Sequence, residues 1–157
     1  MSPTLRHPSV LFLTLFLLDG ITKHLAQSFL ATQSVAINHF LTLHLQYNCG
    51  VAFSLFHSCS WQSQYILISL SMLISGGLAY SVYYQTHNKI EKIGILLIIA
   101  GAIGNVFDRI CYGHVIDFIS LHYHAYYWPT FNLADAFITC GAFLAILSGS
   151  ILTQTKK

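Results

Sequence analysis

The stretch FNLADAFITCGAFLAILSGSILT (residues 131–153) contains the conflict that decides the fold. From Ala136 to Leu147 it is an apolar run suited to the interior of a lipid bilayer, yet its beginning carries Asn132 and Asp135. Moving an ionised carboxylate toward hydrocarbon costs several kcal/mol, or raises its pKa until the group is neutral. An acid at the start of such a helix therefore needs a structural or a chemical explanation.

The composition of the whole chain predicts an integral membrane protein. Of its 157 residues, 55% are hydrophobic and 8% are charged, and the mean hydropathy is +0.62. Soluble domains contain about 25% charged residues, so this chain lacks the polar surface that a water-soluble protein needs. We expect one domain over residues 1–157, a monomer surrounded by membrane lipid, with no nucleic-acid partner.

Four segments are apolar enough to cross a bilayer, for which a helix needs about 20 residues. The predicted spans are residues 9–27, 65–84, 91–110 and 131–152. Asp19 and Lys23 interrupt the first span, and no small-residue cleavage site follows it. We therefore expect a retained helix rather than a cleaved signal peptide. The expected fold is an all-α membrane protein with four transmembrane helices.

Basic residues predict the orientation of these spans. Apart from Lys23 and Arg109, they occur before the first span, at the connection between the second and third and the start of the third, and after the fourth: Arg6, Lys89, Lys92, Lys156 and Lys157. Segments 28–64 and 111–130 contain no Lys or Arg. By the positive-inside rule, both termini are cytoplasmic and the two long segments lie outside.

The two outer segments differ in pattern. In 28–64, Leu43, Leu45 and Tyr47 alternate with other residues, which predicts short strands at the membrane surface. Segment 111–130 is rich in Tyr, Trp and His, which favours an interfacial platform. Cys49 and Cys59 would pair only in an oxidising compartment, and their spacing does not decide the matter.

Acidic residues have an unusual distribution. Three of the five, Asp19, Asp108 and Asp135, lie within the predicted spans, and Asp117 lies on the connection between the third and fourth spans, whereas Glu91 lies at the start of the third span, beside Lys89 and Lys92. Acids within membrane segments are costly and usually functional. Asp19 and Lys23 are four residues apart and lie on one helix face, so they form either a structural ion pair or part of the chemistry.

An Asn-x-x-Asp spacing occurs twice, in GNVFDR (104–109) and in FNLAD (131–135). Because the third and fourth spans are close in sequence, we expect them to pack antiparallel, so that Asn105 and Asp108 meet Asn132 and Asp135 at one level. Asp117, in GHVIDF (113–118), lies on the connection between them. Carboxylates that converge in a pocket of low dielectric share a proton, as in aspartic peptidases.

Spacing alone does not select the pair among Asp108, Asp117 and Asp135. Asp135 with Asn132 also fits a helix N-cap, and Asp108 fits an anchor held ionised by the adjacent Arg109. Outside the peptidases, a proton-coupled transporter would also place polar groups in its spans. We disfavour a transporter because the acids gather toward the outer side of the membrane.

Metal and covalent catalysis have weaker support in the sequence. Nine histidines include HYH (122–124), but a spaced pair without a third ligand in register is a weak zinc signal. A Ser or Cys nucleophile would need a placed base, and none is evident in the sequence. We therefore expect neither a metal nor a cofactor.

Five motifs together resemble the signal peptidase II (lipoprotein signal peptidase) family over nearly the whole chain. They are DGITK (19–23), NCGVAFS (48–54), GNVFDR (104–109), GHVIDF (113–118) and FNLAD (131–135). The sequence departs from the family pattern at Gly20, where Gln is common, and at Val51, where Ala is usual. Both positions are peripheral to the catalytic acids of the family motifs, so the departures concern fine substrate preference rather than the reaction.

The resemblance implies an aspartic endopeptidase of the bacterial cytoplasmic membrane that cleaves diacylglyceryl-modified prolipoproteins before the lipidated cysteine. It implies that Asp117 and Asp135 are catalytic. It further implies pocket roles for one group of residues: Asn48, Gly50, Asn105, Arg109 and Asn132. Asp19, Lys23 and Asp108 would be structural polar groups, and a small β-cradle and a mobile element would lie on the outer side, with Phe53 and Phe56 as an apolar lid.

Overall fold

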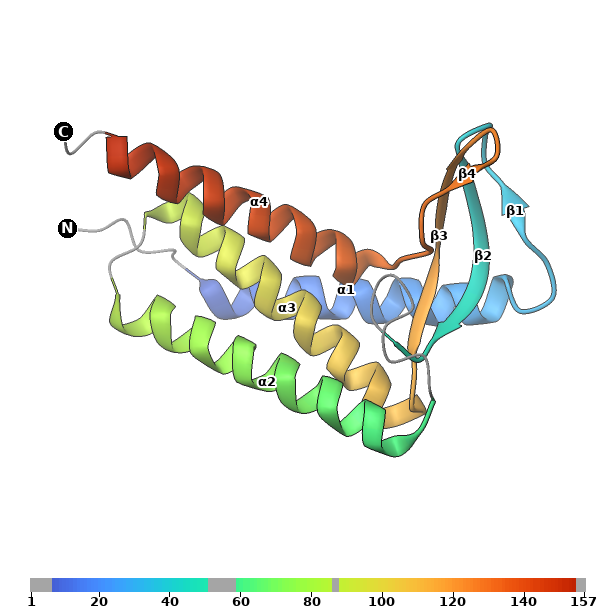
Figure 1. Cartoon of the computed structure of the whole chain (residues 1–157), viewed down its shortest axis with the longest axis horizontal. Coiled ribbons are helices and arrows are strands. Elements are labelled where there is room, and N and C mark those ends of the chain that lie inside the picture. Colours follow the sequence, from blue (N-terminus) through green and yellow to red (C-terminus); the bar gives the residue numbers. More distant parts are fainter. Residues whose placement is uncertain (1–6, 51–58, 86–87, 155–157) are drawn as a thin grey trace.

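Helices make up most of the chain in the computed structural model, which describes residues 7–50, 59–85 and 88–154. The helices are α1 (Pro8–Phe29), α2 (Trp61–Tyr84), α3 (Lys89–Tyr112) and α4 (Leu133–Gln154). Figure 1 shows them as a bundle with an antiparallel sheet at one end. Helix α3 is central, because it packs against each of the other three helices.

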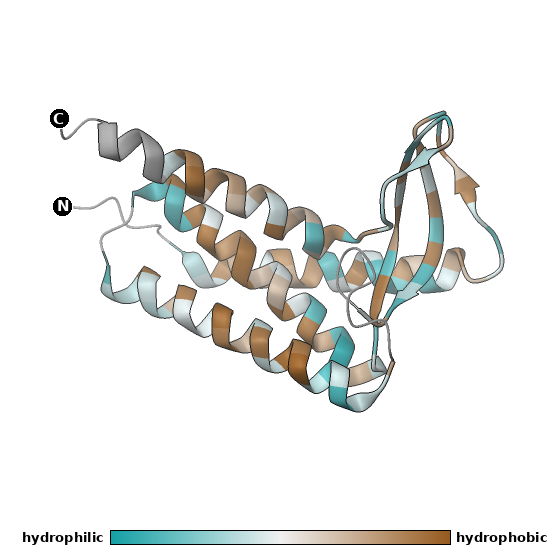
Figure 2. Cartoon of the chain, in the orientation of Figure 1, coloured by the Kyte–Doolittle hydropathy of each residue, from teal (hydrophilic) through white to brown (hydrophobic). Residues whose placement is uncertain are grey.

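The helices follow the predicted spans with shifted boundaries. The largest shift is in α2, which begins at Trp61 rather than residue 65 because Ser60 caps it by accepting a hydrogen bond from the Ser63 backbone N–H. Three helices, α1, α2 and α3, are long and apolar enough to cross a membrane. In α4 the apolar part with described side chains is Leu133–Ser148. Figure 2 shows that hydrophilic residues lie mainly toward the helix ends, including the end beside the sheet.

Among the described residues the sheet has four strands, whereas the sequence predicted short strands only in segment 28–64. Its order is β1 (Val35–Ala36), β2 (Leu41–Asn48), β3 (Val115–Tyr123) and β4 (Tyr126–Tyr127), with antiparallel neighbours. Leu43 and Leu45 pack, as their alternation suggested, against a cluster of Ala26, Leu30 and Phe118. This cluster fixes the sheet on the end of α1.

The interfacial platform expected over 111–130 is instead largely a strand, and this prediction is corrected. Val115–Phe118 is buried, because β3 pairs with β2 on one side and contacts α1 and α3. Aromatic residues at the two ends of the segment are exposed as expected: Tyr112, Tyr123, Tyr126, Tyr127 and Trp128. A central buried strand carries Asp117 into the interior, which a surface platform would not do.

Close approach of α3 and α4 sets the level at which their polar residues meet. A Cβ atom on Gly141 would lie 2.5 Å from the carbonyl oxygen of Gly94, so neither glycine has room for a side chain. Small residues permit this kind of close contact between membrane helices. The two helices consequently bring Asn105 beside the beginning of α4.

Candidate active site

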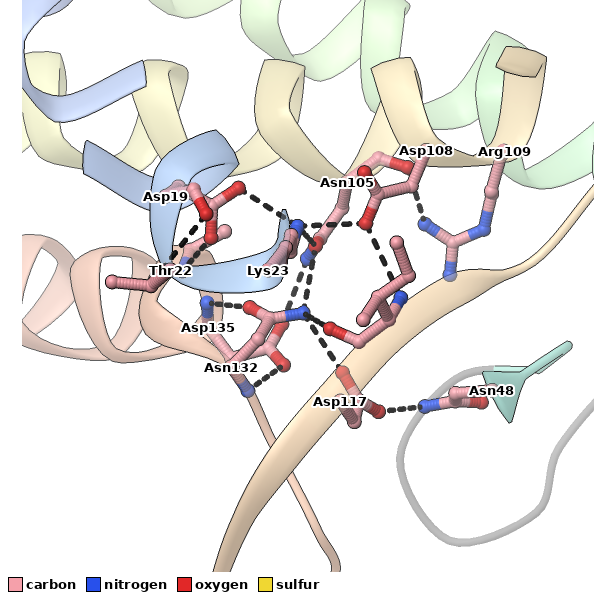
Figure 3. Close-up of polar contacts among 12 residues, drawn as sticks. Asp19, Thr22, Lys23, Asn48, Asn105, Asp108, Arg109, Asp117, Asn132 and Asp135 are labelled. Atoms are coloured by element: carbon pink, nitrogen blue, oxygen red, sulfur yellow. Dashed lines mark hydrogen bonds and ion pairs between the residues drawn. The ribbon is translucent and has the colours of Figure 1, made fainter. Parts of the chain in front are cut away.

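The candidate active site lies where β3, the beginning of α4 and the end of α3 meet (Figure 3). Asp117 comes from β3 and is 1% exposed. Asp135 comes from the first turn of α4 and is half-buried. The two acids that the family motifs singled out are thus brought together from elements that are not adjacent in the sequence.

Two asparagine side chains hold the Asp117 carboxylate. Asn132 Nδ2 donates to Oδ1 at 2.8 Å, and Asn48 Nδ2 donates to Oδ2 at 2.9 Å. Asn48 is the last residue of β2 and pairs with Val115 at the beginning of β3, so the sheet itself places this amide beside Asp117. Each carboxylate oxygen therefore accepts one hydrogen bond.

Asp135 is held in the same manner. Its Oδ1 accepts from Asn105 Nδ2 at 2.8 Å, and its Oδ2 accepts from the Asn132 backbone N–H at 3.2 Å. Asn132 Oδ1 in turn accepts from the Asp135 backbone N–H at 2.9 Å. This reciprocal pair is a capping box, so the capping interpretation of the FNLAD motif is correct, and it also fixes the orientation of Asp135.

Asn132 connects the two acids. Besides its bond to Asp117, its Nδ2 lies 3.1 Å from Asn105 Oδ1 and 3.3 Å from the Ile116 carbonyl oxygen. Asn132 is fully buried. The two Asn-x-x-Asp motifs do meet at one level, and the contact between them is made by the asparagines.

A buried ion cluster of Asp19, Lys23 and Asp108 contacts Asn105. Lys23 Nζ lies 2.7 Å from Asp19 and 2.8 Å from Asp108, and it donates to Asn105 Oδ1 at 3.1 Å. The ammonium has three N–H groups, and it has these three acceptors. The predicted Asp19–Lys23 pair is therefore present within α1. Lys23 also joins α1 to α3 through Asp108 and Asn105.

Both acids of this cluster also accept a hydrogen bond from the backbone of the site, Asp19 through its other oxygen and Asp108 through the oxygen that contacts Lys23. Asp19 Oδ1 accepts from the Ala134 N–H at 2.9 Å, in the first turn of α4. Asp108 Oδ2 accepts from the Ile116 N–H at 3.2 Å, next to Asp117. Asp108 is an anchor as expected, but its cation is Lys23 and not Arg109, because the helix turns Arg109 toward another partner.

Arg109 contacts the turn that follows β2. Its Nη2 donates to the Gly50 carbonyl oxygen at 3.0 Å, and its Nη1 donates to the Asn105 carbonyl oxygen at 3.4 Å. The side chain is 6% exposed. Arg109 therefore positions the backbone beside Asn48 rather than either candidate catalytic acid.

Burial changes the protonation of Asp117. Its removal from water and then the nearby charge of Asp135 raise the pKa of Asp117 to about 7, against the lowering effects of Asn48, Lys23 and Asn132. A carboxyl group with this pKa holds a proton for a large fraction of the time near neutral pH. Asp117 is therefore a candidate proton donor in this polar pocket.

Sequence reasoning missed or left open several features near the site. The structure contains a Cys49–Cys59 disulfide, which spacing could not decide, and a buried Gln64 that donates to the Cys49 carbonyl oxygen. Gln64 lies just before the predicted span 65–84, and no sequence signal marked it. Val51, Phe53 and Phe56 lie outside the described residues.

The histidine-rich segment lies on the sheet, away from the acids. His122 Nε2 lies 3.0 Å from Thr42 Oγ1, and its ring stacks on Tyr127. Among residues 7–50, 59–85 and 88–154, no three His, Cys, Asp or Glu side chains converge in a way that could hold a metal ion. His122 is thus a polar and aromatic side chain that packs within the sheet.

Known proteins of one family resemble this chain. The family model described as signal peptidase (SPase) II matches residues 11–151. The lipoprotein signal peptidase of Francisella tularensis subsp. novicida is 38% identical, with 94% of this chain and 93% of that protein covered. The lipoprotein signal peptidase of Dichelobacter nodosus is 32% identical, with 85% and 86% covered.

Solved structures agree with these relatives. One, described as a bacterial membrane enzyme, has a TM-score of 0.83 and 28% identity, covering 96% of this chain and 91% of its own. A second, with the same description, has a TM-score of 0.75 and 27% identity, covering 89% and 90%. With the family match over most of the chain and relatives above 30% identity, the chain belongs to the signal peptidase II family.

Proposed function

We propose that this protein removes signal peptides from diacylglyceryl-modified prolipoproteins as an aspartic endopeptidase, with Asp117 and Asp135 as the catalytic pair. Membership of the signal peptidase II family and the lipoprotein signal peptidases among the relatives support removal of signal peptides from prolipoproteins. They do not favour the proton-coupled transporter considered from the sequence.

The observation that carries the aspartic mechanism is the pairing of two carboxyl groups through Asn132. Asp117 accepts from the Asn132 side chain, and Asp135 accepts from its backbone N–H. Burial and the Asp135 charge raise the pKa of Asp117 to about 7. Two such groups share one proton, which is the state that acid–base hydrolysis of a peptide requires.

In the proposed reaction, ionised Asp135 takes a proton from a water molecule as the water oxygen attacks the scissile carbonyl carbon. Protonated Asp117 gives its proton to the carbonyl oxygen, so a neutral tetrahedral diol forms. Asp135 then gives its proton to the amide nitrogen, and Asp117 takes one from a diol hydroxyl as the C–N bond breaks. The pair returns to its starting protonation, and neither a metal nor a covalent intermediate takes part.

Position in the bundle supports a substrate anchored in lipid. The site lies at the sheet end of the helices, opposite the beginning of α3, where Lys89 is the first residue (Figure 1). If basic residues mark the cytoplasmic side, the site lies at the outer membrane surface. A preprotein held by its acyl chains and its signal helix presents the bond before its lipidated cysteine at that depth.

The test uses two synthetic prolipoprotein peptides that differ only in the diacylglyceryl group on the cysteine. Purified protein in lipid-containing micelles should cleave the lipidated peptide immediately before the cysteine, which mass spectrometry of both products identifies. Turnover should persist in EDTA. Equal cleavage of the two peptides would contradict the substrate assignment, and loss of activity in EDTA with recovery in zinc would contradict the metal-free mechanism.

A further inference from the structure

Helix α2 contains no Asp, Glu, Lys or Arg, and neither the sequence motifs nor the proposed reaction gives it a role. Its first turns nevertheless contain Gln64, which is 0% exposed. A long polar side chain is rarely buried so completely unless it makes a hydrogen bond. The hydrogen-bond partner of the Gln64 amide therefore indicates why this residue is buried.

Gln64 holds the residue next to Asn48. Its Nε2 donates to the Cys49 carbonyl oxygen at 2.6 Å. The same Cys49 forms the disulfide with Cys59, which comes two residues before α2 begins at Trp61. Cys49 is thus attached to the beginning of α2 twice, once by a covalent bond and once by a buried hydrogen bond.

The orientation of the Asn48 amide depends on this turn. Asn48 Oδ1 accepts from the Gly50 backbone N–H at 3.0 Å, and its Nδ2 donates to Asp117 Oδ2 at 2.9 Å. With the oxygen fixed by Gly50, the direction of the N–H group follows the backbone of residues 48–50. Displacement of the Cys49 peptide would move the donor away from Asp117.

We propose that Gln64 is a positioning residue for the proposed Asp117–Asp135 reaction: together with the Cys49–Cys59 disulfide, it fixes the 48–50 turn on α2 so that Asn48 stays hydrogen-bonded to Asp117. The inference rests on the proposed function, because it concerns the geometry of that catalytic pair. In this proposal α2, which contains none of the five sequence motifs, also supports the site.

Two helices support the turn from different directions. Arg109 of α3 holds the Gly50 carbonyl oxygen, and Gln64 of α2 holds the preceding carbonyl oxygen. Gln64 Oε1 is buried without a hydrogen-bond partner among the residues that the structure describes. An unpaired buried acceptor is unfavourable, so an apolar side chain would be expected here if the position only had to fill space. The single hydrogen bond of Gln64 instead holds the turn at Cys49.

The first experiment compares Gln64→Leu with Gln62→Leu. Leu keeps much of the volume of Gln and removes the donor, while Gln62 lies exposed on the same turn of α2 and serves as the matched control. We expect kcat of Gln64→Leu to fall roughly tenfold, the effect of losing about one hydrogen bond in the transition state. Gln62→Leu should keep the wild-type kcat.

The pH profile distinguishes positioning from a structural role. Charged groups facing Asp117 are Asp135 from α4, Lys23 from α1 and Arg109 from α3, and Gln64→Leu changes none of them. Loss of the Asn48 donor removes an effect that lowers the pKa of Asp117. The decline of activity at high pH should therefore move to higher pH in Gln64→Leu, which a loss of stability alone would not produce.

A double-mutant cycle with Asn48→Ala gives the decisive comparison. If Gln64 acts through Asn48, adding Gln64→Leu to Asn48→Ala causes little further loss of kcat, because the hydrogen bond is already absent. Multiplication of the two effects would overturn the proposal, as would a Gln64→Leu variant with wild-type kcat and pH profile. Melting temperatures of all variants show whether each is folded.

The disulfide supplies a second, independent variant. Cys49→Ser/Cys59→Ser, or wild type treated with dithiothreitol, should show the same direction of change in kcat and pH profile, and the serine variant should not respond to dithiothreitol. An unchanged profile in both would contradict the role of the disulfide. Asp117→Asn is assayed in parallel: if it retains turnover, the catalytic pair itself is wrong, whatever the result at Gln64.

Discussion

At the scale of single residues, Asn132 allows two acidic side chains to lie close together, because it donates a hydrogen bond to each of them. Its Nδ2 serves Asp117, and its backbone N–H serves Asp135. Donors on both carboxylates favour their ionised forms, whereas burial and mutual repulsion oppose double ionisation. For Asp117 the balance leaves the pKa at about 7, with burial and Asp135 raising it and Asn48, Lys23 and Asn132 lowering it.

The pKa of Asp117 predicts the pH dependence of cleavage. Because this acid must be protonated to give its proton to the carbonyl oxygen, and its pKa is about 7, kcat should decline as the pH rises through about 7. The sign follows from deprotonation of the acid, which removes the proton donor. Steady-state rates on a lipidated peptide between pH 5 and pH 9 provide the measurement, and a rate that rises through this range would contradict the assignment.

Lys23 predicts a large effect on stability. The side chain is 2% exposed and pairs with both Asp19 and Asp108. Lys23→Met leaves these two carboxylates buried without their cation, which costs about 3 to 5 kcal/mol. Unfolding titrations in mixed micelles should show this loss, while Lys89→Met, at an exposed position, should not. Equal stability of the two variants would mean that the cluster does not hold the bundle together.

At the scale of elements, the site depends on the register between α3 and α4. Asn105 contacts Asp135 and Asn132 across helices that approach closely at Gly94, Gly101 and Gly141. A sheet strand, β3, then brings Asp117 to the same level. Helix packing and strand pairing thus each contribute one acid, and a shift of either element would separate them.

Gly141→Ala tests this packing. The added Cβ would lie 2.5 Å from the Gly94 carbonyl oxygen and 2.9 Å from Leu97 Cβ, so α3 and α4 must move apart. Overpacking of this kind costs about 1 to 3 kcal/mol, and we expect lower stability together with lower kcat.

The matched control is Gly76→Ala, because a Cβ at Gly76 of α2 meets nothing within 4 Å. That variant should keep both its stability and its activity. If Gly141→Ala behaved in the same way as Gly76→Ala in unfolding and in peptide cleavage, close contact between α3 and α4 would not determine the geometry of the site.

How far the sequence predicts these elements differs from one residue to another. The meeting of Asn105 with Asn132 and Asp135 was predictable, because a short connection makes adjacent spans antiparallel. The pairing of Lys23 with Asp108 was not, since helix rotation relative to a neighbour leaves no local pattern. The strand that carries Asp117 was also missed, because a short apolar run bounded by Gly113 fits a surface segment equally well.

At the scale of the whole molecule, charge predicts how the site faces the membrane. Lys89 and Lys92 lie in the first turn of α3, at one end of the bundle, and the sheet lies at the other end (Figure 1). The positive-inside rule then predicts that the sheet and the acids lie outside. An outward site matches a substrate that has crossed the membrane and remains attached to its outer leaflet.

Reporter fusions test this orientation. A fluorescent protein after Lys157 should fluoresce, and alkaline phosphatase at the same position should be inactive, because both termini are predicted to be cytoplasmic. Alkaline phosphatase placed after His124, in the turn between β3 and β4, should be active. The reverse pattern would place the site on the cytoplasmic side and contradict the proposed route of the substrate.

The most direct test of the central claim is cleavage of a lipidated prolipoprotein peptide by Asp117→Asn and Asp135→Asn, assayed separately beside Asp108→Asn. Each of the first two should lose about a thousandfold or more in kcat while remaining folded, because Asn keeps the shape of Asp and removes its acid–base function. Asp108→Asn should lower rate or yield only in part. Substantial turnover by either Asp117→Asn or Asp135→Asn would contradict the catalytic pair.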